Sequence, residues 1–225
     1  GGEAGPFALS VQQLADEVPF QVEELVTRAG ERFPERRETC WMADEGVGGL
    51  AYSGKIMSPT GWAPGVAKVR DQIAQETGHY FDCALLNLYP DGDAGCRWHT
   101  DPEMGLMWDR DSVVVSVGET RRFNFRPIAP DGTPTGGDAA IYSFHVHDGD
   151  RVWMRRDCND VFQHNVLGGE GPDNNGPRGS IVFKKSLPSP SGKRGHGLQG
   201  TGRRQRPRRP GRGPLVRGWP RRHPP

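Results

Sequence analysis

The sequence has few cysteines and no long apolar run. No stretch approaches the roughly 18 consecutive apolar residues of a membrane-spanning helix, and the mean hydropathy is -0.70. These features predict a soluble protein without a membrane partner. Only four of the 225 residues are cysteines, and no two of them form a CxxC pair. We therefore expect reduced thiols and an intracellular protein rather than a disulfide framework.

Acidic residues are absent from the last part of the chain. Residues 189–225 contain 11 Lys/Arg, seven Pro and eight Gly, whereas residues 1–188 hold 18 Lys/Arg against 28 Asp/Glu. A segment of this composition cannot bury an apolar core, so we expect a disordered basic tail over 189–225. Its run Arg203–Arg209 is consistent with a phosphate-binding arm, with a nuclear localisation signal (a nuclear protein, if eukaryotic), with a solvated extension, or with a gene-model artefact.

Apolar residues recur at helical spacing in three segments of the first third of the chain, 10–18, 19–29 and 64–77. The third segment begins with proline and stops before Gly78, which is the usual order of helix start and stop signals. The first two segments predict a helical lead-in over residues 1–35.

Beyond Gly78 the sequence consists of short β-type runs separated by turn residues. Many strands with helices only in front of them predict an α+β fold, a double-stranded β-helix (jelly roll) over residues 36–188 with the N-terminal helices packed on one sheet. Residues 37–44 and 50–57 predict an earlier pair of strands. The strands expected after Gly78 are 81–89, 96–99, 112–117, 121–128, 140–146, 151–154, 161–167 and 180–187.

Two residues of the tetrapeptide Trp98-His99-Thr100-Asp101 suit metal binding. In an extended strand, His99 and Asp101 point to the same face and could reach one ion. A second imidazole would complete the facial triad of non-haem Fe(II) oxygenases, which leaves positions for a cosubstrate and O2. His164 lies in an expected strand and is the best candidate. An isolated His-x-Asp triplet is also common at protein surfaces, so this spacing alone does not establish a metal site.

The last expected strand carries a candidate anion-binding residue. Oxygenases with this triad usually take the dianion 2-oxoglutarate, whose distal carboxylate is best bound by the planar fork of an arginine. Arg178, Ser180 and Lys184 share one face of this run. The alternative is an ordinary strand with an exposed cation at each end.

Taken together, these residues resemble the AlkB family of iron- and 2-oxoglutarate-dependent oxygenases. The resemblance covers about residues 36–187 and is nearest to the animal members that repair alkylated DNA. It is carried by Phe81-Asp82-Cys83-Ala84-Leu85-Leu86-Asn87-Leu88-Tyr89 and by Trp98-His99-Thr100-Asp101-Pro102-Glu103. Further matching blocks, in order, are Tyr52-Ser53-Gly54 with Ser58-Pro59 and Trp62, Asp91-Gly92, Ser116-Val117-Gly118 with Arg121-Arg122-Phe123, and Arg178 to Lys184.

The resemblance implies a role for each matched position. Glu103 would contact the exocyclic amine of a damaged base, and Tyr52 would stack on that base. The alternative for Glu103 is a solvated turn residue, and the alternative for Tyr52 is an aromatic residue of the core. The implied Fe(II) ligands and catalytic residues are His99, Asp101 and His164. The residues implied to bind 2-oxoglutarate are Asn87, Tyr89, Arg178, Ser180 and Lys184.

The function implied by the resemblance is oxidative demethylation of N-alkylated bases in DNA or RNA by a monomeric enzyme. O2 and 2-oxoglutarate would be consumed, and succinate and formaldehyde released. Expected substrates are 1-methyladenine and 3-methylcytosine, whose methyl groups block base pairing and thereby favour base flipping. There are two alternatives. One is the same chemistry on a regulatory RNA or a protein, and the other is a catalytically weak jelly-roll module that binds modified nucleic acid.

The sequence departs from the family pattern in two places. The family's last strand usually reads Arg-x-Asn-Leu-Thr-Phe-Arg, but this chain has Ser180 and Lys184 at the Asn and final Arg positions. Lysine keeps the charge but lacks the fork, so we expect weaker cosubstrate binding. The segment before Arg37, where the duplex-acting relative has a hydrophobic finger, is shorter here and offers only Phe33. Single-stranded and duplex substrates therefore both stay open.

Overall fold

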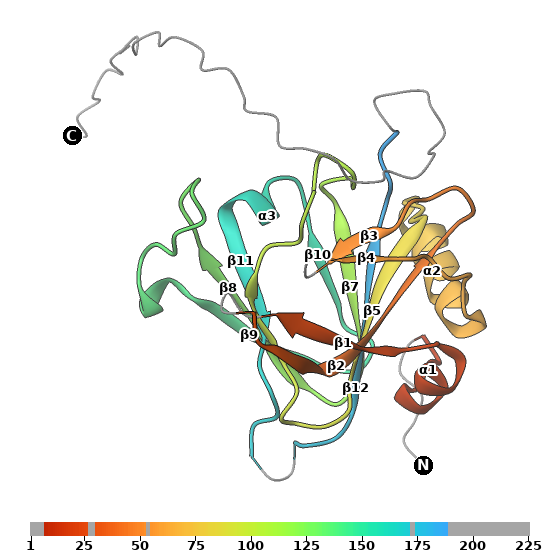
Figure 1. The fold of residues 1–225 in the computed structure, drawn as a ribbon, viewed down its shortest axis with the longest axis horizontal. Coiled ribbons are helices and arrows are strands. Elements are labelled where there is room, and N and C mark those ends of the chain that lie inside the picture. The colour runs from red at the N-terminus through yellow and green to blue at the C-terminus, as the bar shows by residue number, and fades with distance from the viewer. Residues whose placement is uncertain (1–6, 27–29, 53–54, 172–173, 189–225) are drawn as a thin grey trace, which may run out of the picture. The chain divides into compact units, whose positions relative to one another are not determined.

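The computed structural model describes residues 7–26, 30–52, 55–171 and 174–188. The strands of this part of the chain form two antiparallel sheets of six and four strands and a separate two-stranded hairpin. The large sheet lies between the two longest helices, residues 11–17 and 64–77, and the small sheet (Figure 1). This arrangement confirms the predicted jelly roll. The basic tail expected after residue 188 lies outside the described residues.

The six-stranded sheet has the order β1-β2-β5-β12-β7-β10, in which every neighbouring pair is antiparallel. Its central strand β12 is buried along its whole length. The strands are β1 (Gln21–Val26), β2 (Arg32–Ala43), β5 (Cys83–Tyr89), β7 (Ser112–Gly118), β10 (Arg151–Met154) and β12 (Arg178–Lys184).

The four-stranded sheet has the order β6-β11-β8-β9. The strands that follow Gly78 in both sheets match the expected ones, with ends shifted by a few residues. The small sheet consists of β6 (Cys96–His99), β8 (Arg121–Pro127), β9 (Tyr142–Val146) and β11 (Phe162–Val166), and the hairpin consists of β3 (Leu50–Tyr52) and β4 (Lys55–Met57).

Two of the expected helices are present. The side chain of Ser10 caps α1 (Val11–Glu17) by accepting a hydrogen bond from the Gln13 amide. The second, α2 (Pro64–Thr77), ends at Gly78, whose φ of 73° allows the left-handed turn that stops the helix. Shorter helical turns are η1 (Asp138–Ala140) and α3 (Cys158–Val161). No helix among the described residues is long and apolar enough to cross a membrane.

Both helices pack on the outer face of the large sheet, as expected. Leu14 of α1 and Val66, Val69 and Ile73 of α2 belong to the largest buried apolar cluster. From the sheet, the same cluster takes Ala84, Leu86, Val113, Val115, Val117, Ile181 and Phe183. Side chains alternate along a strand, so the residues between these, such as Asn87 and Ser180, face the small sheet.

The helix expected over residues 19–29 is wrong. Residues Gln21–Val26 form β1, which pairs with β2 at the edge of the large sheet. An edge strand can leave one face in water, and Val22 is 58% exposed. The backbone pairing with β2 therefore outweighs the local helical pattern. β2 begins at Arg32, so it runs across the expected boundary at residue 35.

The expected pairing of residues 37–44 with residues 50–57 is also wrong. Strand β2 pairs with β1 and β5, whereas β3 and β4 pair with each other. Met42 and Thr60 make only an isolated bridge. The Gly-rich segment before Leu50 is thus a connection between two sheets rather than a hairpin turn.

Candidate active site

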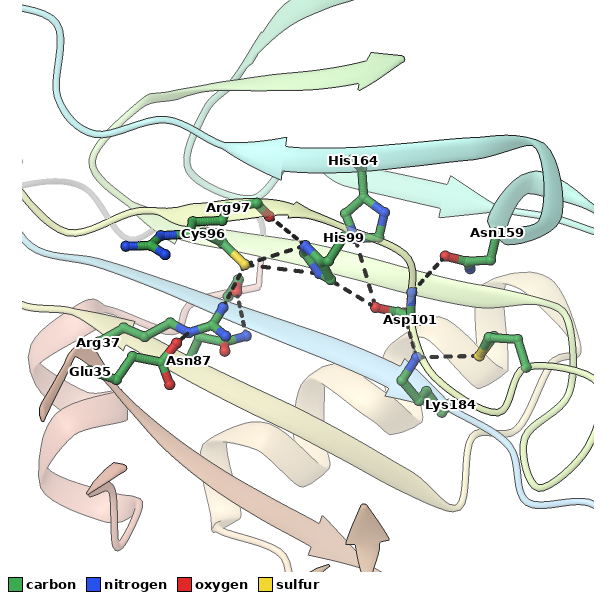
Figure 2. Close-up of polar contacts among 12 residues, drawn as sticks. Glu35, Arg37, Asn87, Cys96, Arg97, His99, Asp101, Asn159, His164 and Lys184 are labelled. Carbon is green, nitrogen blue, oxygen red and sulfur yellow. Dashed lines mark hydrogen bonds and ion pairs between the residues drawn. The ribbon is translucent and has the colours of Figure 1, made fainter. Parts of the chain in front are cut away.

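His99, Asp101 and His164 converge on one point (Figure 2). His99 at the end of β6 is paired across the sheet with His164 of β11. Asp101 Oδ1 lies 3.7 Å from the Nε2 atoms of both histidines, and the three possible ligand atoms lie within 4.8 Å of one another. Two imidazoles and one carboxylate form a 2-His-1-carboxylate metal site, the donor set of non-haem Fe(II) oxygenases.

The second oxygen of Asp101 is held by a cation. Lys184 Nζ donates a hydrogen bond to Asp101 Oδ2 at 2.5 Å and lies 3.5 Å from Met104 Sδ. Burial by itself would raise the pKa of Asp101, but Lys184 and the two imidazoles hold it well below its usual range. The carboxylate is therefore charged, with Oδ1 directed to the metal position.

The backbone of Asp101 is also fixed, by the short helix that precedes β11. Its amide donates a hydrogen bond to Asn159 Oδ1 of α3 at 3.0 Å. Asn159 is buried, and α3 leads directly into β11, which carries His164. One short segment therefore supplies a metal ligand and holds the loop that carries another.

The two histidines have opposite electrostatic environments. Burial, together with His99, lowers the pKa of His164 to about 3, so this ring is neutral and can bind a metal. Burial also disfavours the charged form of His99, but Cys96 and Asp101 raise its pKa to about 9. Metal binding at neutral pH therefore displaces a proton from His99.

Several polar side chains lie on the inner face of the large sheet, opposite the small sheet. Tyr89 of β5 is paired with Arg178 of β12, and Asn87 is paired with Ser180. Asn87 Nδ2 donates a hydrogen bond to Ser180 Oγ at 3.1 Å. All four side chains are buried. A cavity between the sheets is lined by Asn87, Tyr89, Ser180 and Lys184 together with the triad.

Arg178 has unused hydrogen-bonding capacity. Its Nε donates to Ser116 Oγ at 3.3 Å, but Nη1 and Nη2 have no hydrogen-bond partner among the described residues, and neither has Asn87 Oδ1. The side chain is fully buried, and burial lowers the pKa of its guanidinium. A buried cation with two unpaired donors is costly unless an anion binds there. The cluster therefore fits a carboxylate of 2-oxoglutarate, which an arginine can hold with two parallel hydrogen bonds.

Arg37 and Cys96 also line the cavity, and the sequence reasoning missed both. Arg37 donates hydrogen bonds to Cys96 Sγ at 2.8 Å and to Glu35 Oε1 at 2.7 Å. Cys96 Sγ lies 3.5 Å from His99 Nδ1. The pKa of Cys96 is lowered by His99 and Arg37 against the effect of burial.

A β-bulge explains why Cys96 was missed. Residues three apart on a regular strand face opposite sides, which would turn Cys96 away from His99. In the register between β6 and β11, His99 faces His164 and Cys96 faces Val166, so β6 has one extra residue. The extra residue places Cys96 and His99 on the cavity side together.

The two residues expected to contact the base are Glu103 and Tyr52. Glu103 is exposed in a left-handed turn (φ 59°) just after Asp101, and its carbonyl accepts the amides of Leu106 and Met107. Tyr52 ends β3, and its side chain lies outside the described part of the chain, as does that of Phe33. Their roles stay predictions.

Comparison with known proteins identifies the class. Residues 8–180 match the 2OG-Fe(II) oxygenase superfamily, and the chain belongs to it. The protein is an Fe(II)- and 2-oxoglutarate-dependent dioxygenase that uses O2, and His99, Asp101 and His164 form its metal site.

Within this superfamily the chain is AlkB-like. It is 30% identical to bovine (Bos taurus) DNA oxidative demethylase ALKBH2 over 155 residues, which cover 65% of this chain and 53% of the relative. It is 30% identical to uncharacterized protein R406 of Acanthamoeba polyphaga mimivirus over 168 residues, or 75% and 82% of the two chains. The rat (Rattus norvegicus) alpha-ketoglutarate-dependent dioxygenase alkB homolog 3 is 30% identical over 121 residues, 53% of this chain and 40% of the relative.

A solved structure of OsALKBH1 has the same fold, with a TM-score of 0.51 and 12% sequence identity. The similar part covers 78% of this chain and 90% of that one. At this identity the likeness concerns the fold alone. The chain spans just over half the length of bovine ALKBH2, so the activity of that whole protein does not transfer directly.

Proposed function

We propose that the protein oxidatively demethylates N-alkylated bases of DNA or RNA, with 1-methyladenine and 3-methylcytosine as typical substrates. Relatives named DNA oxidative demethylase support the substrate class. The observation that carries the proposal is the buried guanidinium of Arg178, whose two Nη atoms have no hydrogen-bond partner among the described residues. It lies on the inner face of the sheet that also carries Lys184 at the metal site. This arrangement would place a dicarboxylate cosubstrate next to the triad.

When bound, Fe(II) with 2-oxoglutarate and O2 supplies the oxidation of an N-methyl carbon, yielding succinate and CO2 and a hydroxymethyl group that leaves as formaldehyde. The chain's own contribution is positioning. Arg178 orients the distal carboxylate, and Asn87 and Tyr89 hold the cosubstrate from the neighbouring strand. Lys184 keeps Asp101 charged and directed to the metal.

The substrate base is expected on the exposed side of the triad. His99 is the least buried ligand, with a side chain 36% exposed against 6% for His164. Glu103, two residues past Asp101, presents a carboxylate that can accept a hydrogen bond from an exocyclic amine. Tyr52 would stack on the base opposite His99.

The proposal is tested with oligonucleotides that contain 1-methyladenine or 3-methylcytosine, single-stranded and duplex. Formaldehyde and succinate are measured with Fe(II), 2-oxoglutarate and ascorbate. His164→Ala should abolish both products. His145→Ala is the matched control, because His145 is a half-exposed histidine that pairs with Glu170 and belongs to no metal-binding group among the described residues.

The outcomes separate the alternatives. Equal formation of formaldehyde and succinate, lost in His164→Ala only, supports base demethylation. Succinate without repaired base would mean that the chemistry is right and the substrate is another RNA or a protein. Neither product from a folded, iron-loaded sample would leave a binding module as the better explanation.

A further inference from the structure

Aromatic rings extend from the metal site to the surface of the small sheet. Phe125 of β8 is paired with His164 on one side and with Tyr142 of β9 on the other. Its ring centroid lies 5.9 Å from that of His164 and 6.2 Å from that of Phe162, and the Tyr142 and Phe162 rings are 6.0 Å apart. We call Phe125, Tyr142 and Phe162 the aromatic platform. These distances are typical of rings in contact.

The Tyr142 end of the platform is open to solvent, whereas Phe125 and Phe162 are half-buried. Tyr142 is 63% exposed, and Phe144, the next ring on the same face of β9, is 39% exposed. Strand β9 is the edge of the small sheet, at the left of Figure 1. Tyr142 and Phe144 both adjoin Phe125, which in turn contacts His164. Two large exposed rings this near the metal site indicate a binding surface rather than a core.

The platform and the cosubstrate residues lie on opposite sides of His164. Along β11, Val166 follows His164 by two residues and is paired with Cys96, and both line the cavity that contains Asn87 and Tyr89. Phe162 precedes His164 by two residues on the same face. A cosubstrate held by Arg178 therefore leaves the platform free for the other reactant.

We propose that the aromatic platform stacks an unpaired nucleobase next to the damaged one, so that the enzyme acts on single-stranded nucleic acid. This proposal rests on the proposed function. Every base has a π-face, and stacking on exposed aromatic rings is the usual way in which proteins bind single strands without sequence preference. In a duplex, the neighbouring bases are already stacked on each other and are not available to Tyr142.

The test measures binding without turnover. Fluorescence anisotropy of a fluorescein-labelled single-stranded oligodeoxythymidine is compared for the wild-type protein, Tyr142→Leu and Tyr142→Phe. Tyr142→Leu should weaken binding about fivefold, which corresponds to about 1 kcal/mol at 1.4 kcal/mol per tenfold. Tyr142→Phe keeps the ring and should bind within about twofold of wild type. Since Tyr142 is largely exposed, neither variant should lose its fold, which thermal unfolding verifies.

Tyr80→Leu is the matched control. Tyr80 is a second exposed tyrosine, 43% exposed, whose hydroxyl donates to Asp44 near α2. Its replacement should leave oligonucleotide affinity unchanged. With a single-stranded 3-methylcytosine substrate, Tyr142→Leu should raise KM while kcat stays within about twofold, because the lost contact binds substrate and transition state equally.

If Tyr142→Leu binds the oligonucleotide with wild-type affinity and still repairs the damaged base, the proposed role of the platform is wrong and the proposed function stands. An equal loss of affinity for a duplex of the same length would overturn the preference for single strands. If the wild-type protein neither binds the oligonucleotide nor repairs a damaged one, the proposed function fails and the platform fails with it.

Discussion

Replacing Arg178 should separate cosubstrate binding from stability, because the two depend on this side chain in opposite ways. Its two Nη atoms are buried without a partner among the described residues. Each hydrogen bond from a charged donor contributes roughly 1.5–3 kcal/mol. Losing two such bonds in Arg178→Gln should weaken 2-oxoglutarate binding by about 3 kcal/mol, or about 100-fold. Arg178→Lys keeps the charge but loses the fork, so the expected loss is about tenfold.

Stability without the cosubstrate should change the other way. Arg178→Gln removes a buried charge that lacks an anion, so the free energy of unfolding should stay the same or rise. Arg121 is the matched control. It is 1% exposed, and its Nη atoms donate to the carbonyl oxygens of Thr120, Asp91 and Gly176 and to Asn174 Oδ1. Arg121→Gln should therefore lower stability by about 2 kcal/mol or more.

The assay is isothermal titration calorimetry of the Ni(II)-loaded protein with 2-oxoglutarate, combined with urea unfolding of the metal-free protein. Arg121→Gln should bind 2-oxoglutarate as wild type does wherever it is folded. Wild-type affinity in Arg178→Gln, or a stability loss as large as that of Arg121→Gln, would refute the assignment of Arg178 as the carboxylate-binding residue.

Three further predictions concern the metal site. The affinity for Ni(II), measured by calorimetry, should rise with pH up to about 9 and then level off, since the pKa of His99 is about 9 and its ring must lose a proton to bind metal. Lys184→Met should destabilise the metal-free protein by about 3 kcal/mol in urea unfolding, because it removes the cation that donates a hydrogen bond to the buried Asp101 carboxylate. Asn159→Ala should weaken Ni(II) binding about tenfold by releasing the Asp101 amide.

For each of these three predictions, one experimental result would contradict the reasoning. Ni(II) affinity that does not change between pH 6 and 9 would mean that His99 is neutral throughout that range, contrary to its raised pKa. A Lys184→Met protein as stable as wild type would show that Asp101 finds another partner or takes up a proton. If Asn159→Ala binds Ni(II) with wild-type affinity, Asn159 contributes to packing and does not position the metal ligand Asp101.

The sequence by itself determined features that depend on local geometry. Helix α2 follows from apolar spacing, a proline at its start and a glycine at its end. His99 and Asp101 two residues apart, and Arg178 and Lys184 on one strand face, follow from the two-residue period of a strand. The structure brings His164 to the first pair, as the sequence predicted. Each of these features depends on a few consecutive residues, except that the metal site also needs the distant His164.

Only the tertiary structure decided which strands pair and in which register. Residues 21–26 became β1 because β2 offered a pairing edge. The bulge in β6 turned Cys96 toward His99, and α3 brought Asn159 to the amide of Asp101, 58 positions earlier in the chain. The aromatic platform joins three strands of the small sheet. These arrangements depend on hydrogen bonds and packing between distant segments, and the periodicity of a single segment carries no record of its partner.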